Sequence, residues 1–228
     1  MKRFFYFLAV CLPMLVLSSC DLEDENDNGG GSYNGHEYVD LGLSVKWATC
    51  NVGASSPEEY GNYFAWGEIT PKSIYYWSTY KYCNGSSTTM TKYCTSSSYG
   101  TVDDWTTLNL SDDAAHAHWG GIWRMPTEAE QNELINNCTW TWTTDYRGTG
   151  VSGYIVKSKT NSNSIFLPAT GYCTDTNLEE AGSFGTYWSS SLYLNGSDRA
   201  YYLGFDSGDV ARHYGSRYYG RSVRAVCQ

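Results

Sequence analysis

The chain of 228 residues combines few charges with many rings: charged residues make up 17% of it, aromatic residues 16%, and the formal net charge is −9. No basic stripe runs along the sequence, which argues against nucleic acid as a partner. The length suits one domain of ordinary size behind a short export segment.

The N-terminus has the pattern of a lipoprotein signal peptide. Lys2 and Arg3 precede an apolar stretch, residues 4–17, that is too short to cross a bilayer as a stable helix. Leu17-Ser18-Ser19-Cys20 follows, which places a thiol directly after the small residues of a cleavage site. The sequence therefore predicts that residues 1–19 are removed and that Cys20 carries the lipid. An ordinary signal peptide with a chance cysteine is the alternative.

The segment after Cys20 is predicted to be a disordered tether, residues 20–32. Five acids lie within residues 21–27, and a glycine run follows at 29–31, so the segment has little apolar surface to bury. An acidic run behind a lipidated cysteine also resembles the surface-export signals of Bacteroidota lipoproteins. The resemblance implies an outer-membrane lipoprotein exposed on the cell surface, and a periplasmic spacer is the alternative. A single domain is expected over residues 33–228.

The first half of the domain shows one alternating segment and then long loops. Apolar side chains from Val39 to Trp47 alternate with polar or small ones, which predicts a strand with one buried face. Residues 63–67 fit a second strand or an extended loop. Residues 70–107 are rich in Thr, Ser and Tyr and are interpreted as loops.

Two short helices are expected next. Ser111 is the predicted cap of a helix over residues 112–119, which Gly120 and Gly121 end. Thr127 and Glu130 have the spacing of a capping box, and the helix that they open is expected to run to about Asn137.

Short strands follow, punctuated by Gly and Asn. They are predicted over residues 154–157, 165–167, 187–190, 200–205 and 223–226. Two helices among short, mainly antiparallel strands define an α+β fold class.

Six cysteines remain once Cys11 and Cys20 are set aside: Cys50, Cys83, Cys94, Cys138, Cys173 and Cys227. An even number in an oxidising compartment permits up to three disulfides. Cys83 and Cys94 flank a polar loop and each follows a Tyr, so this pair is the favoured one. Buried free thiols are the alternative.

Several motifs resemble a known family, the Fibrobacter succinogenes major paralogous domain proteins, which are abundant as lipoproteins in Bacteroidota. They include Trp123-Arg124-Met125-Pro126-Thr127 and Trp188-Ser189-Ser190, and further matching segments lie at 38–48, 51–54, 66–68, 119–121, 166–171 and 222–226. The resemblance covers about residues 36–227. It implies a C-type-lectin-like fold, in which the terminal strands pair and a long loop region displays a ligand face. The activity of the family is largely unassigned, and fold alone does not define a function.

The Tyr-rich segment 187–221 is the predicted ligand-binding region. Tyr, Ser, Gly and Asn with occasional Arg make up the contact surfaces of antibodies, because Tyr offers a large contact area at low entropy cost. The segment also resembles the variable regions that diversity-generating retroelements rewrite in lectin-fold lipoproteins. Leu203 and Phe205 are expected to face the core, and Tyr202 the other way. The candidate ligand-binding residues are Tyr193, Asn195, Asp198, Arg199, Tyr202, Asp206, Asp209, Arg212, His213, Tyr214, Arg217 and Tyr218.

The expected ligand is a surface glycan or a protein, and the lipid is the expected contact with the membrane. A Tyr-rich surface without a dedicated ligand is the plainer interpretation of the same composition. The alternative function is that of a structural or assembly component of the envelope or of fimbriae.

Patterns for catalysis and metal binding are weak. Asp112 and His116 have the i,i+4 spacing of helical metal ligands, but with His118 facing elsewhere they supply only two ligands, so no metal is expected. The calcium motifs of sugar-binding lectins, a G-x-S-x-G elbow, an H-E-x-x-H motif and a P-loop are all missing from the sequence. Formylglycine-generating enzymes share the broader fold, but their cysteine pair has no recognisable counterpart. The sequence therefore predicts a non-catalytic protein without a cofactor.

Overall fold

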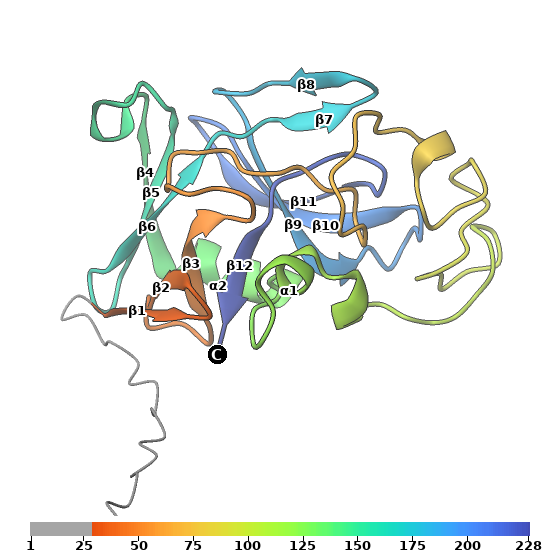
Figure 1. The fold of residues 1–228 in the computed structure, drawn as a ribbon, viewed down its shortest axis with the longest axis horizontal. Helices are drawn as coiled ribbons and strands as arrows, with labels where there is room; N and C mark the ends of the chain where they lie inside the picture. Colours follow the sequence, from red (N-terminus) through yellow and green to blue (C-terminus); the bar gives the residue numbers. More distant parts are fainter. Residues whose placement is uncertain (1–28) are drawn as a thin grey trace, which may run out of the picture.

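The computed structural model describes residues 29–228 (Figure 1). The predicted signal peptide, the lipidation site Cys20 and the acidic part of the predicted tether lie outside the described residues. Within them, no helix is long and apolar enough to cross a membrane. Short, mostly antiparallel strands form several small sheets with two α-helices, which confirms the α+β class.

An N-terminal hairpin opens the fold. Strands β1 (Gly30–Tyr33) and β2 (His36–Val39) pair antiparallel, joined by Asn34 and Gly35. Both turn residues have positive φ, 51° and 81°, as a two-residue hairpin turn of this hand requires. Residues 30–32 therefore belong to a strand and not to the predicted tether, because a glycine edge strand is held by backbone pairing and needs no buried side chain.

The predicted strand over 39–47 is wrong as a single element. Strand β2 ends at Val39 and β3 (Lys46–Asn51) begins seven residues later, with a turn between them. The Asp40 carboxylate accepts a hydrogen bond from the Gly42 amide, and Gly42 has φ of 68°. The alternation nevertheless marked burial correctly, because Leu41, Val45 and Trp47 are all buried.

The first and last parts of the chain meet in one sheet. Strand β12 (Arg224–Cys227) pairs antiparallel with β3, which gives the order β1-β2-β3-β12. The region between β3 and the first helix is confirmed as loops with two short 3-10 turns, Trp77–Thr79 and Leu110–Asp112. Residues 63–67 are an extended loop in which Phe64 makes a single bridge to Arg221.

Both predicted helices exist, but the first has a different cap. Helix α1 (Ala114–Trp119) is capped by Asp113, whose carboxylate accepts from the His116 amide, and not by Ser111. Ser111 lies instead in the preceding 3-10 turn. The Thr127–Glu130 capping box of α2 (Glu128–Asn137) is confirmed, with both reciprocal hydrogen bonds formed.

Three further sheets complete the fold. A meander contains β4 (Cys138–Thr143), β5 (Gly153–Ser158) and β6 (Ser164–Pro168). A small hairpin joins β7 (Tyr172–Thr174) to β8 (Asn177–Glu179). A third sheet has the order β11-β10-β9, formed by β9 (Gly185–Leu192), β10 (Arg199–Phe205) and β11 (Val210–Ser216). The five predicted late strands are confirmed as β5, β6, β9, β10 and β12, while β4, β7, β8 and β11 were not predicted.

Central strands are buried on both faces. On β9, Tyr187 points into one apolar cluster and Trp188 into the other. On β10, Leu203 and Tyr202 divide in the same way. One cluster lies against α2 and the β4–β6 sheet, the other against α1 and the long loops. Figure 1 shows the β4–β6 sheet at the left of the molecule and the long loops at the right.

No disulfide joins any of the six cysteines of the described residues, so the expected Cys83–Cys94 disulfide is wrong. The Cys83 thiol donates to the Trp77 carbonyl and the Cys94 thiol to the Ser96 carbonyl, each at 3.2 Å. Each thiol is thus held by the backbone of its own loop. The alternative of free thiols, with four of the six buried, is the correct one.

Candidate ligand-binding face

Three tyrosines and two arginines form a surface that we call the tyrosine face. It consists of Tyr193, Arg199, Tyr201, Arg212 and Tyr214, and these residues come from the loop after β9 and from the paired strands β10 and β11. Tyr201 lies directly opposite Tyr214 in the β10–β11 register, so their side chains share one side of the sheet. Arg199, Arg212 and Tyr214 are exposed, and Tyr214 leaves 47% of its surface open to solvent.

The three rings contact one another. Tyr193 and Tyr214 stack with centroids 4.0 Å apart and planes 10° apart, and Tyr201 meets Tyr193 edge-on at 5.3 Å. Stacked rings fix one another's side-chain torsions, so the exposed aromatic surface is ordered before any ligand binds.

Two arginines border the rings. The Arg199 guanidinium lies 5.6 Å from the Tyr214 centroid, and that of Arg212 lies 5.0 Å from the Tyr201 centroid. Arg212 also donates to the Glu128 carboxylate at the start of α2, and this hydrogen bond raises the pKa of Arg212. The face therefore offers flat apolar surfaces next to donors that are held in place.

A bulge shapes the face at Tyr201. The β9–β10 register shifts between Ala200 and Tyr202, and the Ser189 hydroxyl donates to the Tyr201 carbonyl at 2.9 Å. Bulges commonly redirect a side chain next to a binding site. Tyr201 shares its strand face with Leu203, yet only Leu203 is buried under the apolar cluster that contains α2.

Three of the predicted ligand residues are buried and are corrected here. Tyr202 is 9% exposed and packs against Trp188 and the guanidinium of Arg221, whose Cζ lies 3.7 Å from the Tyr202 centroid. It does point away from Leu203, but into the second core cluster and not into solvent. Asp198 is also 9% exposed, in the turn before β10, with Oδ2 lying 3.6 Å from Arg199 Nε.

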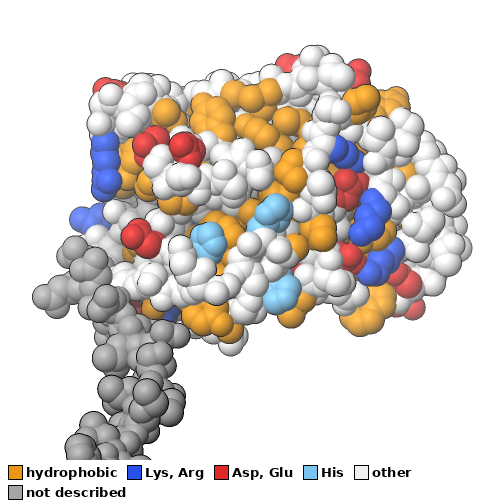
Figure 2. Space-filling view, viewed as in Figure 1, with side chains coloured by type: hydrophobic (Ala, Val, Ile, Leu, Met, Phe, Trp, Pro, Cys, Tyr) orange, Lys and Arg blue, Asp and Glu red, His pale blue; other side chains and the backbone are white. Residues whose placement is uncertain are grey.

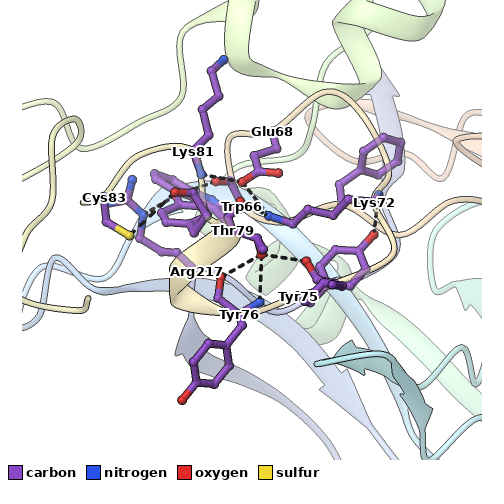
Figure 3. Close-up of polar contacts among 12 residues, drawn as sticks. Trp66, Glu68, Lys72, Tyr75, Tyr76, Thr79, Lys81, Cys83 and Arg217 are labelled. Atoms are coloured by element: carbon purple, nitrogen blue, oxygen red, sulfur yellow. Dashed lines mark hydrogen bonds and ion pairs between the residues drawn. The ribbon is translucent and has the colours of Figure 1, made fainter. Parts of the chain in front are cut away.

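Arg217, the third buried residue, is fully enclosed and acts inside the core. Its guanidinium donates to the Tyr80 hydroxyl at 2.7 Å and to the Ser197 carbonyl at 2.8 Å, and it lies over the Trp66 ring. Figure 3 shows Arg217 beneath the loop that carries Glu68 and Lys72, whose carboxylate and ammonium groups are 2.9 Å apart. These contacts fix the loop, so Arg217 organises the fold and does not face a ligand.

The remaining predicted residues do not gather at the tyrosine face. Asn195 is exposed in the β9–β10 turn, close to the face in sequence. Asp206 and Asp209 close the end of the β10–β11 hairpin opposite Arg199, roughly 20 Å from it along the seven residues of β10. His213 stacks on Tyr202 on the other side of the sheet, at 5.5 Å. Tyr218 packs on Trp77, 4.8 Å away, beside another surface.

Sequence reasoning missed Tyr201 of this face and two residues outside the Tyr-rich segment. Tyr201 shares the strand parity of Leu203 and Phe205, so the pattern assigned it to the core. Glu128 lies outside the predicted ligand segment, although its carboxylate accepts a hydrogen bond from Arg212. Trp105, 53% exposed, is a second overlooked aromatic residue; the Thr107–Ser191 bridge brings its segment beside the end of β9.

The histidines near α1 are held separately. His116 Nδ1 contacts the Trp123 carbonyl at 3.2 Å, and His118 Nε2 contacts the Ile69 carbonyl at 2.9 Å. Within residues 29–228, no three His, Cys, Asp or Glu side chains lie close enough together to hold a metal ion. Figure 2 shows positive and negative side chains side by side over the loop region at the right. In the loops before α1, Lys92 and Asp112 form an ion pair at 2.5 Å.

Comparison with known proteins gives one match. A family described as a domain of unknown function (DUF8237) matches residues 152–226, from the start of β5 into β12. The matched region contains the tyrosine face but only about a third of the chain. No curated protein and no solved structure matches the chain.

Proposed function

We propose that this chain is a lipoprotein of the outer membrane, exposed on the cell surface, that binds a glycan or a protein through the tyrosine face without catalysis. One observation carries the proposal: the Tyr193–Tyr214 stack, in which Tyr214 is exposed and Tyr193 half-buried, with Arg199 over Tyr214 and Arg212 over the adjoining Tyr201. Such rings stack on sugar faces or fill protein contacts, and the arginines donate hydrogen bonds to the polar groups around them.

The anchoring half of the proposal rests on the N-terminal sequence. The signal pattern of residues 1–19 and the position of Cys20 support a lipid anchor as the only attachment to the membrane. The acidic run that follows supports display outside the cell.

A lectin-like fold is part of the same proposal. The pairing of β12 with β3 and the long loop region between β3 and α1 support it, because both features belong to that architecture. The sequence resemblance to the Fibrobacter succinogenes major paralogous domain proteins is the second support.

The test is a screen of the full chain, purified in detergent, against a glycan array and a panel of purified surface proteins. The double variant Tyr193→Ala with Tyr214→Ala removes the stack and is expected to weaken any specific binding by about tenfold or more. Tyr76→Ala is the matched control, because Tyr76 is 53% exposed and lies outside the tyrosine face. Specific binding that the double variant retains in full would refute the assignment of this face.

A further inference from the structure

A second surface lies between two open sheet edges, far from the tyrosine face in sequence. A groove of about 900 Å³ is lined by Gly30, Gly31 and Ser32 of β1 and by Ser164, Ile165 and Phe166 of β6. Figure 1 shows β1 and β6 on the same side of the molecule. Consecutive side chains of a strand point to opposite faces of its sheet. Three consecutive residues of each strand line this groove, so the groove runs along the edges of the two strands.

Strand β1 is an edge strand that presents unpaired backbone groups. The Asp40 amide donates a hydrogen bond to the Gly29 carbonyl. Every second residue pair of an antiparallel ladder is hydrogen-bonded, so the hydrogen-bonded pairs of β1 and β2 are 29–40, 31–38 and 33–36. The amides and carbonyls of Gly30 and Ser32 therefore point away from β2. No other part of the described chain hydrogen-bonds to them.

Strand β6 is the edge of its own sheet and has the same property. The Ser158 amide donates to the Asn163 carbonyl, so the paired positions on β6 are Ile165 and Leu167. The amides and carbonyls of Ser164 and Phe166 point away from β5, and within residues 29–228 they bond to nothing else. Two open edges thus border one groove, and an open edge is a ready template for another strand.

The groove lining includes one cation, Arg147, and one carboxylate, Glu37, and no ion pair joins the two. Arg147 is exposed, lines the groove, and lies over the Tyr146 ring at 5.1 Å. Tyr146 in turn stacks on Phe166 with centroids 3.8 Å apart, so the arginine is supported from β6. Among the described residues no acidic side chain forms an ion pair with Arg147.

We propose that this groove binds an extended peptide of a partner protein, which adds a strand to the free edge of β6 and places a carboxylate against Arg147. The glycines of β1 leave bare backbone along the opposite wall, where a second chain can approach closely. Main-chain hydrogen bonds supply the affinity in this mode of recognition, and the Arg147 contact selects an acidic residue. The site is independent of the tyrosine face.

The test starts with a phage-displayed library of random heptapeptides, selected on the full chain in detergent. We expect enriched peptides to carry Asp or Glu, and the corresponding synthetic peptide to bind Arg147→Gln about tenfold more weakly. Lys81→Gln is the matched control, since it removes an exposed cation from another surface. No enrichment, or equal binding to Arg147→Gln, would overturn the proposal.

Amide hydrogen exchange then locates the peptide. Binding should slow exchange at Ser164 and Phe166, while Ile165, already paired with β5, should stay protected throughout. Bound peptide without protection at Ser164 and Phe166 contradicts strand addition. If both amides are already slow in the free chain and become fast when the five acids of residues 21–27 are changed to Ser, the chain's own acidic segment occupies the groove and a partner peptide is refuted.

Discussion

The Arg217 guanidinium donates a hydrogen bond to the Tyr80 hydroxyl across 2.7 Å and 137 positions of sequence. The same guanidinium donates to the carbonyls of Lys92, Tyr93 and Ser197, and no carboxylate of residues 29–228 forms an ion pair with it. A buried cation held by neutral oxygens and rings thus joins the long loops to the end of β11. These oxygens come from three separate parts of the sequence, at Tyr80, at Lys92–Tyr93 and at Ser197, so the loop region depends on one side chain.

Replacing Arg217 should therefore destabilise the whole domain. Arg217→Met leaves several buried oxygens without a donor, and we expect a loss of roughly 3 kcal/mol in the free energy of unfolding. Arg217→Lys retains the charge but not the fork of donors, so its loss should be smaller, about 1–2 kcal/mol. Denaturant titration measures both. Arg199→Met is the exposed control, and a change of equal size there would contradict the argument.

Ser111 and Asp113 both carry acceptor side chains near the start of α1, and replacing them should change stability by different amounts. Asp113 accepts hydrogen bonds from the amides of His116 and Met125, so Asp113→Ala should cost about 1–2 kcal/mol. Ser111→Ala should change stability by less than about 0.5 kcal/mol. Thermal unfolding of the two variants compares their losses of stability. A larger loss for Ser111→Ala would show that Ser111 caps the helix, as the sequence predicted.

The buried carboxylate of Asp112 should make stability depend on pH. Burial alone would raise its pKa, but hydrogen bonds from Lys92, Tyr82 and Tyr93 outweigh burial and lower the pKa below its ordinary value. Its contribution is therefore present above the ordinary aspartate pKa, about 4, and is lost as pH falls through the lowered value.

The variant Asp112→Asn isolates this contribution. Compared with the unmodified chain, it should be about 2 kcal/mol less stable at pH 7, and the difference should shrink as pH falls below about 4. Free energies of unfolding measured from pH 7 to pH 2 test whether the difference between the two proteins shrinks on acidification. Asp209→Asn, in an exposed turn, should show no such convergence, and a difference for Asp112→Asn that grows on acidification would be the wrong sign.

Free thiols predict a particular labelling pattern. Burial raises the pKa of Cys138 and of Cys173 to about 11, and the thiolate is the reactive form. Labelling with an aromatic disulfide reagent at pH 8 should therefore be slow in the folded protein at both positions. After unfolding, all six thiols of residues 29–228 should react. Fewer reactive thiols, or a lower unfolding midpoint after reduction, would show that a disulfide forms.

Local patterns predicted much of the fold, because their causes are local. The Thr127–Glu130 capping box forms within one turn, so four residues suffice to predict it. The end of β2 and the start of β3 were not predicted. The turn at Gly42 separates the two strands, while apolar and polar residues continue to alternate through the turn and the apolar ones are still buried. Strand β11 was missed because its exposed arginine and tyrosine resemble a loop.

The candidate site was predicted as a region but not as a set of residues. Composition located the Tyr-rich segment, and Tyr193, Arg199, Arg212 and Tyr214 do lie together. The alternation of side chains along β10 could not distinguish Tyr201 from Tyr202, because other parts of the chain pack on both faces of this strand. On the face that Tyr201 shares with Leu203, this packing covers Leu203 and ends before Tyr201.

The sequence by itself determined the α+β class, the helix positions and the segment that carries the candidate face, since each follows from composition or from neighbours along the chain. Only the tertiary structure decided which side chains of that segment reach solvent and that β1 and β6 leave two open edges along one groove. The burial of a side chain and the exposure of a strand edge depend on which distant segments of the chain pack against them, and a local sequence pattern contains no information about those segments.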